Sequence, residues 1–182
     1  MENSKKLKKL FQILIPIIIV AIIAAIWLIK NTEQKPATDN IVDNTAEAAD
    51  FALDVTEELD LEQLKSYGVP IIIDFGADSC IPCKEMAPVL KELNEELQGK
   101  AIIKFVDVWK YQSFAEGYPI SVIPTQVLFD SKGNPYTPKD ANAVILNMYS
   151  SKDTNEHIYT THEGGITKEE LLDILKEMGL EE

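Results

Sequence analysis

The feature that most constrains the fold of this 182-residue chain is the segment VPIIIDF at residues 69–75. It is a nearly continuous run of β-branched and other apolar side chains, broken mainly by Asp74. Such a run is typical of a strand that is buried on both faces, because helices cover both sides of the sheet to which it belongs. We therefore expect residues 69–75 to form a central strand of an α/β sheet.

The patterns on either side predict the rest of this sheet. Apolar side chains recur at helical spacing in three segments, the last of which begins with a Thr-x-x-Glu capping box. Strand patterns alternate with them along the chain, so the order is that of an α/β domain. The predicted helices are residues 59–67, 84–97 and 169–178, with a short helical piece at 112–117, and the other predicted strands are 51–55, 101–109, 125–129 and 144–149.

The N-terminal 30 residues are predicted to form a membrane anchor. Four lysines precede an apolar run at residues 11–29, and a helix over that run would be about 28 Å long, close to the hydrocarbon thickness of a bilayer. The lysines place the N-terminus in the cytoplasm and the rest of the chain outside it. A cleaved signal peptide is the alternative, but the run is longer than the usual signal core and no small-x-small site closes it.

The remainder divides into a tether and one acidic domain. Residues 31–50 are polar and read as a flexible linker, and residues 51–182 as the domain, with an insertion at 134–156 to which the sequence assigns no role. Residues 1–30 carry a net charge of +4, which leaves −17 for residues 31–182 in a chain of net charge −13. This strong negative charge argues against nucleic acid or anionic lipid as the main partner of the domain.

The chain has two cysteines, Cys80 and Cys83, which excludes a disulfide-stapled scaffold. Both lie where the predicted central strand gives way to a helix, so free N–H groups and the positive end of the helix dipole face Cys80. These features favour a thiolate, which is the attacking form of the thiol. We expect Cys80 to be the nucleophile and Cys83, one turn into the helix, to resolve the mixed disulfide.

Here the sequence resembles a known family. The segment IIIDFGADSCIPCKEMAPVL at residues 71–90 resembles the active-site region of thioredoxins, in which a strand bearing Asp-Phe leads into Trp-Cys-Gly-Pro-Cys-Lys. The similarity extends over about residues 51–178 and includes Lys84, Pro88 and the later Ile123-Pro124-Thr125. It implies a thioredoxin-like fold, with a central mixed sheet flanked by helices, and we expect an N-terminal transmembrane helix before it.

The resemblance also implies roles for individual residues. Asp74 corresponds to the family's buried acid, which accepts the proton of the resolving cysteine and whose pKa burial should raise. Pro124 corresponds to the family's cis-proline beside the dithiol, and Pro82, Lys84 and Ile123 are supporting residues. The sequence departs from the family at Gly76 and Ser79, where thioredoxins carry tryptophans.

The implied function is that of an extracytoplasmic thiol–disulfide oxidoreductase anchored in the cell membrane, of the TlpA-like, ResA-like or CcdA-associated type. Proline before the second cysteine favours a reductase of protein disulfides, and a disulfide-forming oxidase of the same fold is the alternative. A CcdA-type or DsbD-type membrane protein would supply electrons, in cytochrome c maturation or in cell redox homeostasis. No cofactor beyond the redox-active disulfide is expected.

A metal site is a further alternative. His157 and His162 could join the two cysteines as four zinc ligands, and a metal carrier or a redox-inactive scaffold would then replace the enzyme. The long separation of the pairs and the buried strand before the cysteines argue against zinc, so we expect no metal. We expect both histidines to face solvent near the last strand.

Overall fold

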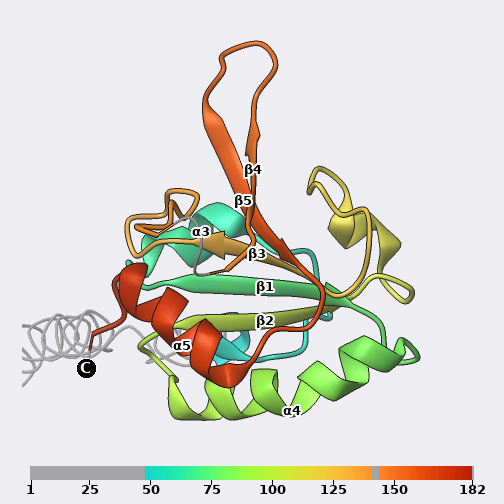
Figure 1. The fold of residues 1–182 in the computed structure, drawn as a ribbon. Helices are drawn as coiled ribbons and strands as arrows, with labels where there is room; N and C mark the ends of the chain where they lie inside the picture. Colours follow the sequence, from blue (N-terminus) through green and yellow to red (C-terminus); the bar gives the residue numbers. More distant parts are fainter. Residues whose placement is uncertain (1–47, 141–143, 182) are drawn as a thin grey trace, which may run out of the picture. The chain divides into compact units, whose positions relative to one another are not determined.

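The computed structural model describes residues 48–140 and 144–181, which contain a five-stranded mixed sheet of order β2-β1-β3-β5-β4 (Figure 1). Strands β1 and β2 are parallel, and the other pairings between these five strands are antiparallel. The strands are β1 (Ile71–Gly76), β2 (Ile102–Asp107), β3 (Thr125–Phe129), β4 (Asn147–Ser150) and β5 (His157–Glu163). The α/β architecture with a mixed sheet is therefore confirmed.

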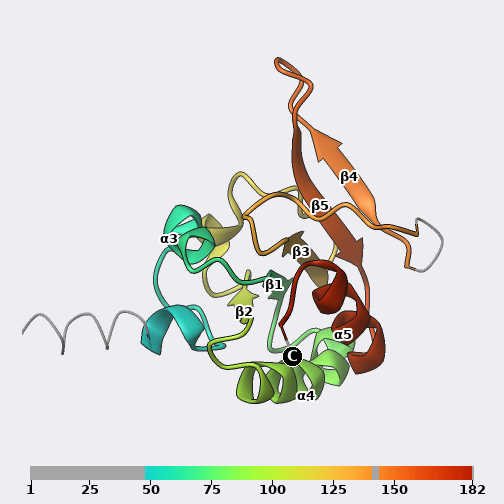
Figure 2. The same ribbon diagram turned by 90° about the vertical axis from the view of Figure 1, so that its left-hand side faces the viewer.

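Helices cover both faces of this sheet. One face packs against α4 (Ile81–Glu96) and α5 (Lys168–Glu177), which run beneath the strands in Figures 1 and 2. The other face packs against α3 (Leu61–Ser66) and the segment around the 3₁₀ helix η1 (Gln112–Ala115). Two hydrophobic layers result, one on each side of β1.

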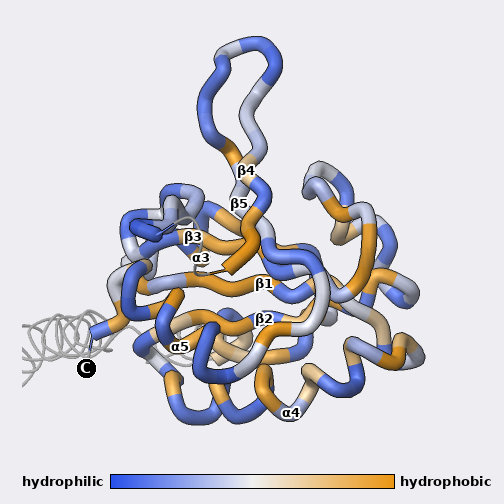
Figure 3. The backbone as a smooth tube through the Cα atoms, viewed as in Figure 1, coloured by the Kyte–Doolittle hydropathy of each residue, from blue (hydrophilic) through white to orange (hydrophobic). Residues whose placement is uncertain are grey.

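Strand β1 lies in the centre of the sheet because its side chains have apolar partners on both sides. All six of its residues are buried. Ile72 belongs to the layer under α4 and α5, whereas Ile71 and Ile73 belong to the opposite layer. Figure 3 shows hydrophobic residues along much of β1 and its neighbour β2. The central strand expected from residues 69–75 is confirmed.

The last helix begins where its capping residues predict. Thr167 accepts a hydrogen bond from the backbone N–H of Glu170, and the carboxylate of Glu170 accepts one from the N–H of Thr167. These two bonds satisfy donors that the first turn of a helix otherwise leaves free. Helix α5 then buries Leu171 and Leu175 against the sheet.

The strand expected at residues 51–55 is wrong in extent. Residues 48–51 are helical, and only Asp54 pairs with β2, in a single parallel bridge to Phe105. The reason lies in the side chains around the helical turn: Phe51 is buried edge-on against Tyr67, and Lys104 binds two backbone carbonyl groups of the turn. These contacts close the turn before the chain reaches the edge of β2.

The insertion predicted at residues 134–156 supplies the outer edge of the sheet. It contains β4, which pairs with β5 through a register shift between Tyr149 and Ser150. Together the two strands form a hairpin that projects away from the rest of the domain (Figure 1). The expected strand at 144–149 thus exists, although it is shorter and begins later.

Within residues 48–140 and 144–181, no helix has the length and apolar character needed to cross a membrane. The anchor predicted at residues 11–29 lies outside the described residues, as does most of the linker predicted at 31–50. Residues 48–50, at the end of that linker, belong to the helical turn that leads into the domain.

Candidate redox site

The two cysteines lie at the start of α4, directly after β1. Cys80 is the N-cap residue and is half-buried, whereas Cys83 lies one turn inside the helix with 4% of its surface exposed. Both are free thiols in this structure. Pro82 occupies the first turn, where a helix has no use for a backbone N–H, so its ring stabilises the helix start without loss of a hydrogen bond. The more accessible thiol is thus presented at the helix end.

The Cys83 thiol is hard to ionise. Burial raises its pKa to about 12, and a hydrogen bond with Cys80 and the negative charge of Asp74 act in the same direction. A hollow of about 140 Å³ borders this thiol and is lined partly by Lys84, Leu90 and Phe105. At neutral pH Cys83 is therefore protonated and needs a base before it can attack.

Asp74 is the acidic residue that can serve as this base. It projects from the middle of β1, is 1% exposed, and has its pKa raised to about 7 by burial, an effect that a hydrogen bond from Gln126 partly opposes. Its Oδ1 accepts that bond at 2.6 Å, while its Oδ2 has no hydrogen-bond partner in the described part of the chain. A carboxyl group with a pKa near neutrality can both accept and release a proton under ordinary conditions.

Gly76 lies between the acid and the thiol. A Cβ atom at this position would be 3.3 Å from Asp74 Oδ2 and 3.3 Å from Cys83 Sγ. It would also lie 2.8 Å from Cε2 of Phe105, a distance that real Cβ atoms do not adopt. The absence of a side chain at Gly76 therefore lets the ring of Phe105 lie over the end of β1, beside both reacting groups.

Replacing Gly76 by alanine should lower the free energy of unfolding by about 1–2 kcal/mol, because the ring of Phe105 must move to accept the new methyl group. Chemical denaturation measures this change. Gly165→Ala is the matched control, since a Cβ there meets no atom within 4 Å and its backbone conformation is ordinary for an alanine. Equal stabilities for the two variants would contradict the close packing at Gly76.

The loop that precedes β3 lies beside the dithiol, because β3 begins at the end of the sheet where β1 ends. The peptide bond between Ile123 and Pro124 is cis, and the carbonyl oxygen of Ile123 lies 3.9 Å from Cys80 Sγ. The loop is held by two hydrogen bonds: the hydroxyl of Thr125 donates to the carbonyl of Val122 at 2.7 Å, and the N–H of Gly164 donates to the carbonyl of Pro124 at 2.8 Å. The structure thus brings Pro124 and Ile123 together with the cysteines.

The segment between β1 and α4 is fixed by the end of β2. Asp107 accepts backbone hydrogen bonds from Asp78, Trp109 and Lys110, and Lys110 forms ion pairs with both Asp107 and Asp78. Burial alone would raise the pKa of Asp107, but these donors outweigh it and hold the pKa below its usual value. The loop that carries the dithiol is therefore tied to the end of β2 and the residues that follow it.

Two polar residues, one bonded to Asp74 and one bonded to that partner, were not expected from the sequence. Gln126 of β3 is fully buried and donates to Asp74, and its Oε1 accepts a hydrogen bond of 2.7 Å from Nδ1 of His162 on β5. The expectation that His162 faces solvent is wrong, because strand alternation turns it toward Gln126. The available signal was Gln126 itself, an amide directly before the apolar residues 127–129 of a buried strand.

His157 is also engaged rather than free in solvent. Its Nε2 lies 3.0 Å from the carbonyl of Tyr159 and 2.8 Å from the hydroxyl of Thr160. Among the residues that the structure describes, no three or more His, Cys, Asp or Glu side chains are grouped as a metal site would need. The two histidine rings have different partners, Thr160 for His157 and Gln126 for His162.

The remaining predicted residues lie at the surface. Lys84 and Ser79 are both exposed, and Ser79 thus stands beside the dithiol without contributing to the core. Ile81, which takes the place of the family's glycine between the cysteines, is 72% exposed. An apolar side chain is therefore presented to solvent directly beside Cys80.

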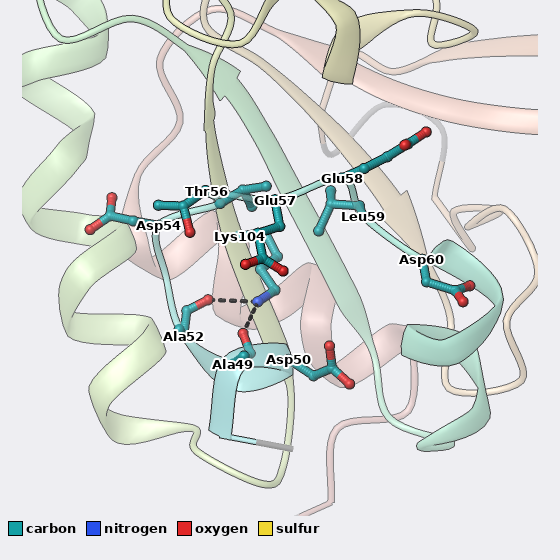
Figure 4. Close-up of a pocket in the computed structure, with 11 residues that line it drawn as sticks. Ala49, Asp50, Ala52, Asp54, Thr56, Glu57, Glu58, Leu59, Asp60 and Lys104 are labelled. Atoms are coloured by element: carbon teal, nitrogen blue, oxygen red, sulfur yellow. Dashed lines mark hydrogen bonds between the residues drawn. The ribbon is translucent and has the colours of Figure 1, made fainter. Parts of the chain in front are cut away.

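A second hollow lies away from the dithiol, between the helical turn at residues 48–51 and the segment that follows it (Figure 4). It has a volume of about 220 Å³, and acidic side chains surround it, among them Asp54, Glu57 and Asp60. At its base Lys104 donates hydrogen bonds of 2.7 and 2.8 Å to the carbonyls of Ala49 and Ala52. These bonds give Lys104 a structural role, as the cap of the helical turn.

Replacing Lys104 by methionine keeps the length of the side chain but leaves two backbone carbonyls without their donor. We expect the free energy of unfolding to fall by about 2 kcal/mol. Lys100→Met is the control, because Lys100 is exposed, and a surface substitution should change stability by less than about 0.5 kcal/mol. Urea denaturation of both variants tests the difference, and an unchanged Lys104→Met variant would contradict the capping role.

Comparisons with known proteins agree with this arrangement. The family model for Thioredoxin matches residues 54–148, which is more than half of the chain. Thioredoxin Y, chloroplastic, of Oryza sativa subsp. japonica is 38% identical over 74 residues, which cover 41% of this chain and 44% of that protein. A thioredoxin of Staphylococcus aureus is 38% identical over 84 residues, covering 43% of this chain and 80% of that one.

The chain spans less than half the length of the chloroplastic relatives that it matches. Among solved structures, a thioredoxin variant from Halobacterium salinarum aligns with 71% of this chain and 91% of its own, at 24% identity and a TM-score of 0.49. The matched family segment contains β1, the dithiol, β2 and the loop of Pro124. The chain belongs to the thioredoxin family.

Proposed function

We propose that this protein is a thiol–disulfide oxidoreductase that reduces disulfide bonds of other proteins through Cys80 and Cys83. One observation carries the proposal: an accessible thiol at the start of a helix is paired with a buried, protonated thiol, and an acid with a pKa near 7 lies beside the second. This arrangement separates the two steps of thiol–disulfide exchange between two sulfur atoms.

The exchange begins when the thiolate of Cys80 attacks one sulfur of the substrate disulfide. A mixed disulfide forms, and the other substrate sulfur leaves as a thiolate. Cys83 then gives its proton to Oδ2 of Asp74 and attacks Cys80 Sγ, which releases the second substrate thiolate. The substrate gains two electrons, the enzyme keeps a Cys80–Cys83 disulfide, and no cofactor takes part.

The surface around Cys80 suits an unfolded or extended protein segment. Ile81 and Val122 are large apolar residues that are 72% and 50% exposed, and they adjoin Cys80 and Ile123 in the chain. Apolar side chains beside a reactive thiol favour polypeptide substrates over small polar disulfides, because their burial contributes to binding. We therefore propose protein disulfides as the substrate class.

We further propose that the domain works outside the cytoplasm as a reductase. Support comes from the lysines and apolar run of residues 5–29 and from Pro82, which precedes the second cysteine. A reductase in this position cannot use cytoplasmic reductants directly, so a CcdA-type or DsbD-type membrane protein would return electrons to the dithiol. TlpA-like and ResA-like roles, such as cytochrome c maturation, are the corresponding physiological setting.

Reduction of insulin by the full-length chain, with dithiothreitol as the electron source, tests the proposed activity. Activity above the reagent background is expected, and its absence would overturn the proposal. The direction of electron flow is tested by equilibrating the dithiol with glutathione buffers. A reductase should have a potential near roughly −270 mV, and a value near roughly −120 mV would make the protein an oxidase.

The location is tested by labelling intact cells with a thiol reagent that does not cross membranes. Cys80 should react from outside if the domain is extracytoplasmic, and a variant with Cys80→Ser gives the background. Labelling that occurs only after the cells are opened would contradict the proposed orientation.

A further inference from the structure

Three polar side chains from three adjacent strands form a continuous hydrogen-bonded row that ends at the acid of the redox site. Asp74 of β1 pairs in register with Gln126 of β3, and Gln126 pairs in register with His162 of β5. Residues that are paired across strands point to the same face of a sheet, which here is the face under α4 and α5. The row therefore lies on the same side of the sheet as Cys83.

The orientation of the Gln126 amide is determined by its surroundings. Its Oε1 faces Nδ1 of His162 at 2.7 Å, and since an amide oxygen only accepts hydrogen bonds, Nδ1 must carry the proton. Its Nε2 faces three acceptors: Oδ1 of Asp74 at 2.6 Å, and the carbonyl of Gly164 and Sδ of Met86, each at 3.3 Å. Turning the amide over would set oxygen against oxygen at Gly164.

In this orientation the two carboxylate oxygens of Asp74 have different roles. Oδ1 is occupied by the amide of Gln126, so it is held in place and is less available for a proton. Oδ2 has no hydrogen-bond partner within the described residues, and it shares the space above Gly76 with Cys83 Sγ. A carboxylate that is clamped through one oxygen presents the other as its proton acceptor.

We propose that Gln126 and His162 are positioning residues for proton transfer from Cys83: His162 fixes the amide of Gln126, and the amide holds Asp74 with Oδ2 toward the thiol. The inference rests on the proposed function, because it concerns the second step of the same exchange. It adds two residues to the site, neither of which touches the reacting sulfur atoms.

The charged groups around the row are compatible with this role. Burial lowers the pKa of His162, while Glu170 of α5 and Glu163 of β5 oppose the effect. The negative charge of Asp74 acts on the dithiol, where it contributes to the raised pKa of Cys83. Both the neutral Nδ1–H ring and the charged ring of His162 donate to Gln126, so the amide keeps its orientation in either state.

The experiment follows the two steps separately with a chromogenic aryl disulfide. Attack by Cys80 cleaves the reagent and releases one aryl thiolate, and attack by Cys83 on the resulting mixed disulfide releases a second one. The full-length chain is compared with Gln126→Leu, His162→Leu and His162→Asn over a range of pH. Asparagine is the conservative variant, because its side-chain N–H can take the place of the Nδ1–H of histidine.

The first release should be the same in all four proteins. Gln126→Leu should slow the second release about tenfold near neutral pH, since a hydrogen bond to a charged group is lost, and should move the midpoint of its pH profile upward. His162→Leu should shift the profile in the same direction, and His162→Asn should restore it. Identical profiles for the native chain and Gln126→Leu, or for His162→Leu and His162→Asn, would overturn the positioning role.

Failure of the proposed function gives a different result. If the native chain releases no aryl thiolate faster than its Cys80→Ser variant does, the exchange mechanism itself is wrong. The carboxyl carbon signal of Asp74 in NMR spectra provides a second measurement that does not depend on catalysis: the pKa of Asp74 should rise in Gln126→Leu. An unchanged pKa of Asp74 in a folded Gln126→Leu chain would contradict the positioning role even if the rates differ.

Discussion

Replacing Cys80 by serine is expected to reduce insulin-reducing activity by roughly a thousandfold or more, because the hydroxyl group of serine cannot form the attacking anion near neutral pH. The change should leave the fold intact, since Cys80 is only half-buried and its side chain makes no capping hydrogen bond at the start of α4. Insulin reduction and circular dichroism on the same sample measure the two properties.

The matched variant is Cys83→Ser. It keeps the nucleophile and removes the resolving thiol, so it should form a stable mixed disulfide with a protein substrate, visible by mass spectrometry. Activity that survives in Cys80→Ser would assign the chemistry to another group, and a stable adduct in Cys80→Ser but not in Cys83→Ser would reverse the roles of the two sulfur atoms.

Local patterns were sufficient to predict the elements around the dithiol. The apolar run at residues 69–75 predicts β1 because burial on both faces favours an apolar side chain at almost every position. The Thr167 and Glu170 pair predicts the start of α5 because the capping box is formed by residues close in sequence. In both cases the information lies within a few residues of the element itself.

The partners of Asp74 depend on contacts that no local pattern describes. Gln126 and His162 meet because β3 and β5 pair in one particular register, and a shift of one residue would turn His162 to the opposite face. The sequence thus predicted the buried acid through its resemblance to a family, whereas the polar Gln126 in a buried strand did not by itself reveal its partner. The placement of Phe105 over Gly76 has the same origin, in the parallel register of β1 and β2.

The strand predicted at residues 51–55 was wrong for a different reason. The alternation of apolar and acidic residues there fits a strand, and Leu53 and Val55 do exchange hydrogen bonds with Phe105 of β2. The pairing stops after one bridge because Lys104 draws the preceding carbonyls into a helical turn. A lysine more than fifty positions away therefore determines the local structure.

Replacing Asp74 by asparagine should raise the free energy of unfolding on the order of a few kcal/mol at about pH 8. The pKa of Asp74 is about 7 in the folded chain, above its usual value of 3.8, so between these pH values the folded chain retains a proton that the unfolded chain has lost. Stability therefore falls as the pH rises through this window. Asparagine carries no charge and can still accept the hydrogen bond from Gln126.

The gain should shrink as the pH is lowered and should vanish below about pH 3, where both states of the native chain carry a protonated Asp74. Urea denaturation of the native chain and the variant at several pH values measures this. Asp153→Asn is the control, because Asp153 is exposed on the β4–β5 hairpin and should give no gain at any pH. A gain that is independent of pH would show that ionisation of Asp74 is not its cause.

The same substitution should slow the second step of the exchange about a hundredfold while leaving the first step unchanged, because asparagine cannot accept the Cys83 proton. The buried carboxylate of Asp74 lowers stability at the pH of the reaction. We infer that the chain retains it because its free oxygen accepts the Cys83 proton. If Asp74→Asn gained stability and resolved mixed disulfides at the native rate, the carboxylate would have no part in proton transfer. The loss of stability at Asp74 would then lack a functional explanation.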